Sequence, residues 1–449
     1  MRGLLPALLA LMALAAAPPP VSAQDVVFGQ PEADAVLGQP TTFRTALQST
    51  SRPATVELLL RLPGERAVTV MPAEVSGSGG SWQAEAALEG HLAPNSRFSY
   101  RFRVRDSAAG DTLGPEAEVI VADQRFSWRT LEGGVIRLHW YEGDEAFARR
   151  ALEIGEAAVA NASELLGVVE TEPIDFFIYD SESSLRDALG PGTRENVGGQ
   201  AHADIRTLFG LIEPHEINSD WVDTLVVHEL THLVFDTATD NPYHAPPRWL
   251  NEGVAVYLSE GYSASWRASI ENAVSRRSLI PLDGLGGLFP TTLEQFELAY
   301  AESVSAVDFF IGQHGEPTLW SLVGSYAQGL SDDEAFTAAT DGDLAAFNAE
   351  WMASLGVDVP APLGPQPGAP GPLPPGWDTP AGTPLPTLAP GQTAGPPATT
   401  GPVRPTPGPG EPPADGGQAG PLTVGLAVGL LVVLGVVVLA VLARRRLLT

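Results

Sequence analysis

The sequence has no cysteine among its 449 residues. This absence excludes disulfide bonds, thiol nucleophiles and zinc sites built from thiolates. The fold must therefore depend on ordinary hydrophobic cores, with or without the help of a metal held by other side chains.

Basic residues are also scarce. Lysine and arginine together number 25 against 54 aspartates and glutamates, which gives a formal net charge of −29. So strong a negative charge argues against nucleic acid as a partner, and against tight docking of the folded part onto anionic lipid. We interpret the acidity as a contribution to solubility.

The first residues have the pattern of a secretory signal peptide, which we predict for residues 1–23. Arg2 supplies the positive start, and the apolar run at 4–17 is too short to span a bilayer. Small residues at the −3 and −1 positions predict cleavage before Gln24. A buried N-terminal helix is the alternative, but the prolines at 18–20 would end such a helix here.

An uncharged apolar run near the C-terminus predicts a single transmembrane helix at residues 421–443. The 22 residues at 422–443 are enough to cross about 30 Å of hydrocarbon. Arginines follow at 444–446, and positive charge next to a span stays on the cytoplasmic side. We therefore predict a single-pass protein of the cell membrane, with its ectodomain outside and a short basic cytoplasmic tail at 444–449. The alternative is a sorting tail that is later removed.

Short alternating segments predict a β-sandwich, immunoglobulin-like or fibronectin-like, at residues 24–123. Turn signals at 63–64, 76–80 and 109–111 separate its strands. His91 stands alone there as an expected surface loop residue, and no catalytic cluster is visible. The predicted strands are 56–60, 67–70, 98–104 and 118–121.

The pattern then changes, and residues 124–356 predict an α+β domain large enough for a substantial core. Strands and helices alternate at first, and the chain is expected to be mainly helical from 218 to 355. Before that point the predicted strands are 135–140, 174–179 and 203–212, and the predicted helices are 144–166 and 181–189.

Residues 357–420 hold 20 of the 41 prolines, with glycine, alanine and threonine between them. Such a composition cannot bury enough apolar surface to fold. We predict a disordered, extended and semi-rigid stalk between the α+β domain and the membrane.

The most informative segment runs from His228 to His232 and reads His-Glu-Leu-Thr-His between apolar flanks. On a helix, residues four apart lie on one face, so both imidazoles can reach one metal ion. Glu229 is offset around the helix, close to the metal without occupying its shell. HExxH sites use this arrangement to bind zinc and to hold a general base beside the metal-bound water. The alternative is a core helix with two hydrogen-bonded histidines.

A catalytic zinc ion needs a third protein ligand and one open position. Glu252 follows twenty residues after His232, in an apolar segment of helical period at 247–257. A carboxylate on a buried helix is unfavourable unless it is paired or binds a metal. Proline-containing turns within 236–246 let the second helix pack back on the first. The two signals together predict a zinc site formed by His228, His232 and Glu252.

These two segments resemble those of a known family. His-Glu-Leu-Thr-His followed by Trp-Leu-Asn-Glu-Gly at 249–253 is similar to the gluzincin metallopeptidases of peptidase MA-like type, and the second segment is close to that of the M1 aminopeptidases. The likeness runs over residues 126–355 and leaves out the sandwich, the stalk and the span. It implies a zinc peptidase with the three ligands named above and Glu229 as general base.

Two departures from the family pattern bear on activity. Tyr300 leads a Tyr-Ala-Glu-Ser segment similar to the family's Tyr-x-Lys-Gly, whose tyrosine hydrogen-bonds the oxyanion, but the Lys and Gly are replaced. Without the resemblance, Tyr300 is a core or rim aromatic. The M1 segment Gly-x-Met-Glu-Asn, whose glutamate captures the free amine of the substrate, is absent. The nearest segment, 197–202, has glycines that can admit a substrate strand but no acidic residue. This favours endopeptidase activity, or action on a substrate that the sequence does not identify.

Residues around the motif carry less information. His202, His215 and His244 are expected in loops or on the surface. Because zinc-binding histidines donate their second N–H to an oxygen, Thr231 or Asp236 is expected to accept such a bond, and the sequence does not choose between them.

The sequence thus predicts a membrane-anchored, extracytoplasmic zinc metallopeptidase that acts on a peptide or protein. In the predicted reaction Glu229 takes a proton from water and passes it to the leaving amine, while Tyr300 and the zinc stabilise the oxyanion. The alternative is a cell-surface binding or adhesion protein whose zinc domain is structural or inactive. An intact Glu229 argues against it, because a structural site has no use for a base.

Overall fold

The computed structural model describes residues 26–105, 110–191 and 198–359. The predicted signal peptide, the stalk beyond residue 359, the transmembrane helix and the basic tail lie outside these residues and stay predictions. Within the described ranges, no helix combines the length and the apolar character needed to cross a membrane.

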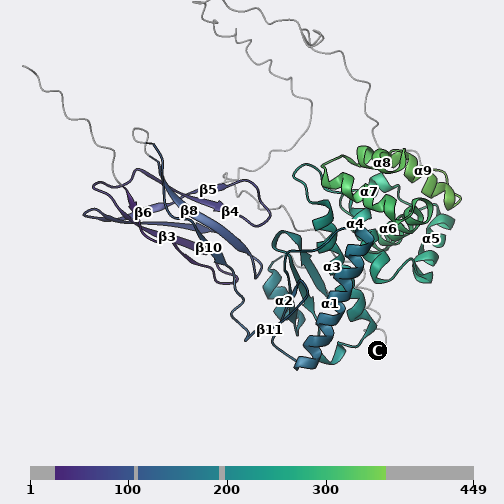
Figure 1. Cartoon of the computed structure of the whole chain (residues 1–449), viewed down its shortest axis with the longest axis horizontal. Coiled ribbons are helices and arrows are strands. Elements are labelled where there is room, and N and C mark those ends of the chain that lie inside the picture. The colour runs from purple at the N-terminus through teal and green to yellow at the C-terminus, as the bar shows by residue number, and fades with distance from the viewer. Residues whose placement is uncertain (1–25, 106–109, 192–197, 360–449) are drawn as a thin grey trace, which may run out of the picture. The chain divides into compact units, whose positions relative to one another are not determined.

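The N-terminal part of the chain, which we name the β region (residues 26–122), consists of short strands. These are β1 Val27–Phe28, β2 Glu32–Asp34, β3 Thr41–Gln48, β4 Thr55–Arg61, β5 Thr69–Pro72, β6 Glu74–Ser78, β7 Ser81–Leu88, β8 Arg97–Arg105, β9 Thr112–Leu113 and β10 Ala117–Ile120. They form two antiparallel sheets of order β1-β3-β7-β6, with β2 on β3, and β10-β8-β4-β5, with β9 on β8 (Figure 1).

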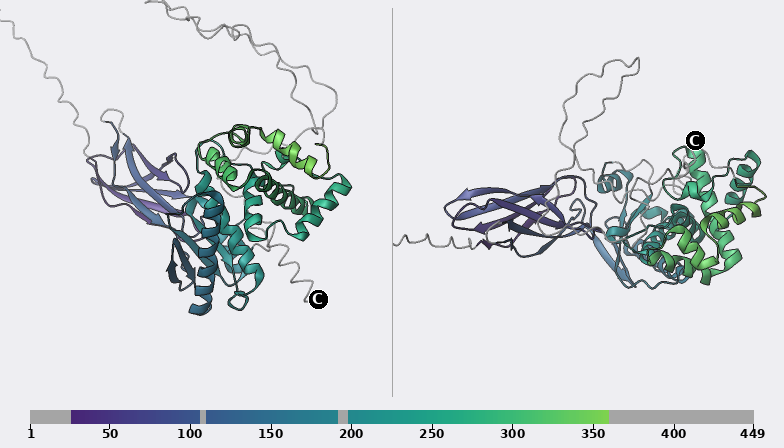
Figure 2. Two further views of the ribbon diagram at one scale, coloured as in Figure 1. Left: turned by 45° about the vertical axis from the view of Figure 1, so that its right-hand side comes forward. Right: turned by 90° about the horizontal axis from the view of Figure 1, so that it is seen from above.

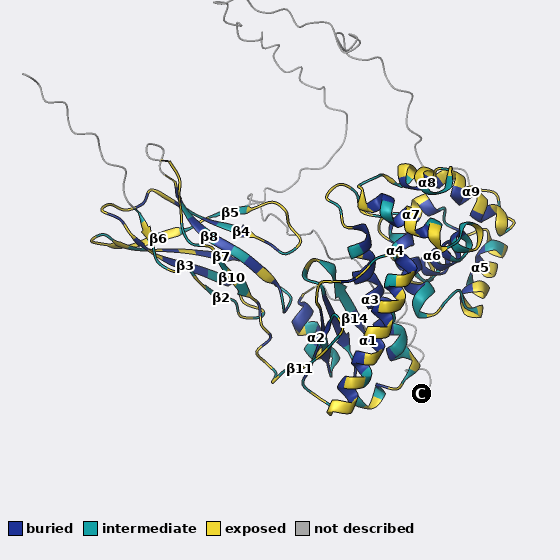
Figure 3. Ribbon diagram, in the orientation of Figure 1, coloured by how far each residue is buried: buried dark blue, intermediate teal, exposed yellow. Residues whose placement is uncertain are grey.

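The two sheets share one core because their strands alternate between buried and exposed residues. Along β8, Phe98, Tyr100, Phe102 and Val104 are buried and the residues between them are not (Figure 3). These side chains pack in one cluster with others from the opposite sheet, such as Phe43 on β3. The predicted two-sheet, all-β architecture of this region is confirmed.

The predicted turn at 76–80 is wrong in its first part. β6 continues to Ser78 and pairs with β7, so only Gly79 and Gly80 connect the two strands. Both glycines have positive φ, 66° and 89°, as a tight two-residue hairpin requires. The serines and glycines marked the turn correctly but made it appear longer than it is.

The second part of the chain, which we name the α+β region (residues 129–357), has one sheet and nine helices among the described residues. Its strands are β11 Arg129–Gly133, β12 Ile136–Trp140, β13 Ile174–Tyr179, β14 Gly199–His202 and β15 Thr207–Leu211. Its helices are α1 Glu145–Leu166, α2 Glu182–Leu189, α3 Asp220–Thr239, α4 Arg248–Ser259, α5 Ala264–Arg276, α6 Leu293–His314, α7 Glu316–Ala327, α8 Asp332–Thr340 and α9 Leu344–Ser354.

The sheet has the order β11-β12-β13-β15-β14, with parallel pairs in its centre and an antiparallel strand at each edge. Helices α1 and α3 pack together on one face, over Leu138, Phe176 and Leu208 (Figure 2). Helix α2 covers Tyr179 and Phe209 on the other face. The predicted strands at 135–140 and 174–179, the two predicted helices and the helical second half are confirmed.

The predicted strand at 203–212 is wrong in its first half. Residues Ala203–Ile205 form a single 3-10 turn, and Arg206 then adopts a left-handed backbone with φ of 48° before β15 begins. The sequence also missed β11 and β14. Both are short edge strands, whose extended form comes from pairing with a neighbour as well as from their own residues.

Helices α3, α4 and α6 form the part of the core that carries the predicted site. The packing of α4 on α6 is close enough to require glycine at one point. A Cβ added to Gly253 would lie 2.5 Å from the carbonyl oxygen of Ser303. Glycine has no side chain at this position, which allows the helix that carries Glu252 to lie directly against the helix that carries Tyr300.

Candidate metal centre

Helix α3 brings the two histidines of the motif together in the core. His228 and His232 are buried, and their Nε2 atoms lie 3.1 Å apart. The one-turn spacing puts both rings on the same face, as predicted, with an interplanar angle of 85°.

Helix α4 adds the third side chain. The Oε2 atom of Glu252, which is fully buried, lies 3.6 Å from Nε2 of His228 and 3.6 Å from Nε2 of His232. Ligand bonds of 2.0–2.1 Å in a tetrahedron put neighbouring ligand atoms about 3.3 Å apart. The three observed separations bracket this value, so the donor set fits a zinc ion that keeps a fourth position open.

Three buried polar atoms at this point have no hydrogen-bond partner among the described residues. They are His228 Nδ1, Glu229 Oε1 and Glu252 Oε2. Buried polar atoms in folded proteins are nearly always satisfied, and exceptions need a reason. Glu252 Oε2 is directed at two imidazole nitrogens, and a metal ion bound there would supply its missing partner.

The oxygen partner expected for the ligating imidazoles is a different residue from those predicted. Oδ1 of Asn251 accepts a hydrogen bond from Nδ1 of His232 over 2.7 Å. The hydroxyl of Thr231 instead donates to the carbonyl of Val227. Within the described residues, neither ring donates a hydrogen bond to Asp236. Asn251 directly precedes Glu252 in the second motif, and this position next to a predicted ligand could have indicated its role as hydrogen-bond partner of His232.

Glu229 lies between helix α3 and the edge of the sheet. Its Oε2 atom accepts a hydrogen bond of 3.0 Å from the backbone N–H of Ala201 on β14. A Cβ on Gly199 would lie 3.3 Å from Cγ of Glu229 and 2.9 Å from Leu225. The glycine predicted to admit a substrate strand therefore also leaves room for the Glu229 side chain.

The electrostatic surroundings favour the ligand form of two of these groups, Glu252 and His232. Burial lowers the pKa of His228, but the nearby carboxylates of Glu252 and Glu229 outweigh burial and raise it. Burial raises the pKa of Glu252, but His228, His232 and Arg248 outweigh burial and lower it to about 2. Burial lowers the pKa of His232 to about 4, so this ring is neutral and can donate a lone pair. Burial and the Glu252 carboxylate raise the pKa of Glu229 to about 8. A nearby dication would lower this last pKa and favour the carboxylate.

Tyr300 is buried on α6 beside the histidines. Its ring centroid lies 6.4 Å from that of His228, and it packs against Phe289 and Phe296. The structure thus brings together all five residues predicted for the site.

The remaining predicted histidines lie elsewhere. His202 is on β14 rather than in a loop, and its ring packs edge-on against Phe209, on the sheet face opposite α3. His244 pairs with Asp332 and His215 lies near Glu213. None of these three contacts the cluster formed by His228, His232 and Glu252.

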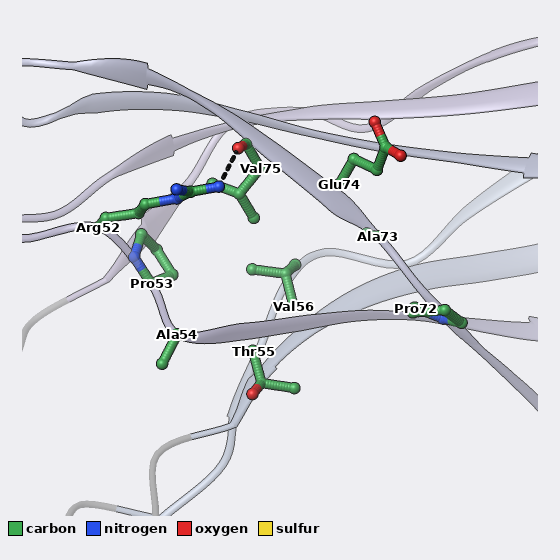
Figure 4. Close-up of a pocket in the computed structure, with 9 residues that line it drawn as sticks. All are labelled: Arg52, Pro53, Ala54, Thr55, Val56, Pro72, Ala73, Glu74 and Val75. Atoms are coloured by element: carbon green, nitrogen blue, oxygen red, sulfur yellow. Dashed lines mark hydrogen bonds between the residues drawn. The ribbon is translucent and has the colours of Figure 1, made fainter.

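The β region has an open pocket of about 590 Å³, where the chain passes from one sheet to the other between β5 and β6 (Figure 4). One side of the pocket is stabilised by Arg52, whose Nη2 donates to the carbonyl of Val75 over 2.7 Å. Its lining has no histidine and a single carboxylate, so it offers neither a metal ligand set nor a nucleophile with its base. The lining residues are Arg52, Pro53, Ala54, Thr55, Val56, Pro72, Ala73, Glu74 and Val75.

The α+β sheet, with a buried His-Glu-x-x-His helix packed on a second glutamate helix, points to the class of zinc-peptidase-like domains. The family model of the Peptidase MA superfamily matches residues 155–357, which include all five site residues. The match confirms the predicted resemblance of this part of the chain to the Peptidase MA superfamily. No curated protein matches the chain.

Several solved structures are similar to the chain at low identity. One is an aminopeptidase N family protein from Idiomarina loihiensis, with a TM-score of 0.36, 10% identity, and coverage of 69% of this chain and 73% of that one. Another is the M1 zinc metallopeptidase from Deinococcus radiodurans, with a TM-score of 0.31, 13% identity, and coverage of 74% and 92%. A variant of that metallopeptidase bound to a Tyr-Ser-Ala substrate has a TM-score of 0.33, 12% identity, and coverage of 76% and 96%. The likeness to the Peptidase MA superfamily rests on the family model.

Proposed function

We propose that the chain is a zinc metallopeptidase that hydrolyses internal peptide bonds. The observation that carries the proposal is the spacing of the three donor atoms of His228, His232 and Glu252, 3.1 to 3.6 Å apart in a buried site. The match of residues 155–357 to the Peptidase MA superfamily model supports the reaction type.

Each residue has a role that follows from its position. His228, His232 and Glu252 hold the zinc, which when bound supplies a Lewis acid that polarises the scissile carbonyl and makes water more acidic. Glu229 is the general base. Ala201 fixes one of its oxygens, and the other, Oε1, is left to accept the proton of the attacking water and later to deliver it to the leaving amine.

Tyr300 is proposed to stabilise the oxyanion. It lies on α6 beside His228, in a layer of aromatic rings that fixes its orientation. A buried phenol in such a layer is a preorganised donor, which loses little freedom when negative charge develops on the substrate.

The edge strand β14 is proposed to hold the substrate backbone. The carbonyl of Gly198 accepts a hydrogen bond from the N–H of Leu211, at the end of β15. Along an antiparallel strand, every second residue directs its N–H and C=O groups at the same neighbouring strand, and the residues between direct theirs at the other side. Gly199 therefore presents its N–H and C=O, and Ala201 its C=O, to the outer edge of the sheet, while the N–H of Ala201 is held by Glu229. An extended peptide can pair there by strand addition. Residues 198–202 contain no acidic side chain to bind a free amine, which supports endopeptidase activity.

The proposed location of the α+β region is the outer side of the cell membrane. The apolar run at 422–443 and the arginines at 444–446 support a single span with the C-terminus inside. Protease treatment of intact cells should remove the ectodomain and leave a C-terminal epitope protected. Protection of an ectodomain epitope would contradict this orientation.

The function is tested by incubating the soluble ectodomain with a proteome-derived peptide library and identifying the new ends by mass spectrometry. We expect internal cleavages that a chelator abolishes and added zinc restores. Zinc well below one ion per chain would exclude the zinc site, and no cleavage by zinc-loaded protein would favour the binding or adhesion alternative.

A further inference from the structure

Arg248 begins helix α4 four residues before Glu252, so the two side chains lie on one helical face. The side chain of Arg248 is 12% exposed and that of Glu252 is not exposed at all. Nε and Nη2 of Arg248 each lie 3.1 Å from Oε1 of Glu252. Both donors therefore meet the same carboxylate oxygen.

This geometry differs from the usual arginine–carboxylate pair. A guanidinium fork normally places two parallel N–H groups on two carboxylate oxygens. Here Oε1 receives both hydrogen bonds, and Oε2 receives none from the described residues although it is buried. The free oxygen is the one directed at His228 and His232, at 3.6 Å from each.

Arg248 is itself fixed by the segment before α6. Its backbone N–H donates to the carbonyl of Gly286 over 2.8 Å, and its guanidinium lies over the ring of Phe289 at 4.6 Å. Phe289 in turn packs edge-on against Tyr300, with ring centroids 5.4 Å apart. The arginine thus links the third ligand of the site with the residue proposed to stabilise the oxyanion.

We propose that Arg248 is a positioning residue that makes Glu252 a ligand through one oxygen only. The inference rests on the proposed function, because it concerns the zinc of that site. A carboxylate can bind zinc through one oxygen or through both, and the second mode would occupy the position that a catalytic site keeps open. With Oε1 held by two charge-assisted hydrogen bonds, only Oε2 is available to the metal.

The test compares Arg248→Gln with the wild-type ectodomain and with Arg150→Gln. Arg150 pairs with Asp223 over 2.7 Å and joins α1 to α3, so its removal breaks an ion pair in the same region without touching Glu252. Cobalt(II)-substituted proteins give visible spectra whose intensity separates four-coordinate from five-coordinate metal. Zinc affinity is measured by competition with a chromogenic chelator, and folding by circular dichroism.

We expect Arg248→Gln to fold, to bind zinc about 10- to 100-fold more weakly, and to give the weaker cobalt spectrum of a five-coordinate ion. Arg150→Gln should keep wild-type affinity and spectrum. A folded Arg248→Gln protein with both properties of the wild type would overturn the role of Arg248. Should that variant not fold, Arg248→Lys keeps the charge without the fork and should change both properties in the same direction, and wild-type values there would overturn the role equally. Wild-type protein that binds no zinc would overturn the proposed function itself.

Discussion

The two regions of the chain bury different kinds of polar groups. The polar residues buried in residues 26–105 are Thr41, Thr45, Ser49 and Ser96, which are all neutral hydroxyls. The α+β region buries ionisable groups, among them His228, Glu229, His232, Glu252 and Glu302. Burying a hydroxyl is inexpensive once it is hydrogen-bonded, whereas burying an ionisable group is unfavourable unless it is paired, neutral or bound to a metal.

This difference shows that folding alone explains the buried residues of the β region but not those of the α+β region. In the β region, alternating apolar residues satisfy the requirements of folding and leave little that needs further explanation. In the α+β region, several carboxyl groups lie in positions that hydrophobic residues would fill more favourably. Two of them, Glu229 and Glu252, lie where the histidines meet, and the proposed function gives a reason for retaining these two.

The largest expected effect concerns the buried base. Glu229→Gln keeps the shape of the side chain and removes its ability to take a proton. We expect the folded variant to retain one zinc ion per chain and to lose about 10²- to 10⁴-fold in kcat, measured on a peptide identified as a substrate. Glu153→Gln, a change on the exposed surface of α1, is the matched control and should behave as wild type. Full activity of Glu229→Gln would exclude the proposed base.

The next effect tests the β region as a purely structural core. Phe102 is 1% exposed on β8, and Phe102→Ala should reduce the free energy of unfolding by about 3–5 kcal/mol through lost burial and a cavity. Denaturant unfolding measures the change, and metal analysis of the folded variant should show unaltered zinc content. Loss of zinc from the folded variant would show that zinc binding in the α+β region depends on the core of the β region.

Metal removal should affect the two regions unequally. Zinc at 100 times its Kd adds about 2.7 kcal/mol to the stability of whatever unit binds it. Hydrogen exchange followed by mass spectrometry should therefore show faster exchange in α3 and α4 after chelation, and unchanged exchange in β3 and β8. Equal acceleration in both regions would contradict a metal site confined to the α+β region.

The parts of the site that sequence predicts are those encoded locally on one helix. His228, Glu229 and His232 follow from helical spacing within five residues, and Glu252 from a second helical segment close by in the sequence. The contacts that complete the site join segments distant in sequence. The N–H of Ala201 reaches Glu229 across 28 positions, and no local pattern encodes that contact.

The secondary structure shows the same difference between locally encoded elements and elements that depend on distant contacts. Long periodic segments such as 144–166 gave α1 nearly to the residue, because Asp144 caps its first turn and Gly167 ends it in a left-handed conformation. Strand β14 has four residues, Gly-Gln-Ala-His, with little strand preference. Its conformation depends on pairing with β15, a tertiary contact that the local sequence does not encode.

The smallest expected effect separates Glu302 from the buried carboxylates of the metal site. Glu302 is fully buried on α6, its Oε1 accepts from the N–H of Ile280 over 2.9 Å, and Oε2 has no hydrogen-bond partner among the described residues. No basic side chain in the described part of the chain pairs with it, and burial raises the pKa of Glu302 well above its usual value. Burial therefore favours the neutral acid over the carboxylate, and Glu302→Gln should change the free energy of unfolding by less than about 1 kcal/mol at low pH.

The pH dependence of this variant gives the sharper test. Because the folded-state pKa of Glu302 is raised, the folded protein holds this proton more tightly than the unfolded chain does. The resulting stabilisation is complete below the unfolded pKa, near 4.5, and is lost as the pH rises toward the raised folded value. Glutamine does not titrate, so the stability of Glu302→Gln relative to wild type should increase over that interval, measured by denaturant unfolding at a series of pH values. A variant that instead loses several kcal/mol at every pH would mean that the charged form of Glu302 is stabilised by a partner, and the contrast with Glu252 would fail.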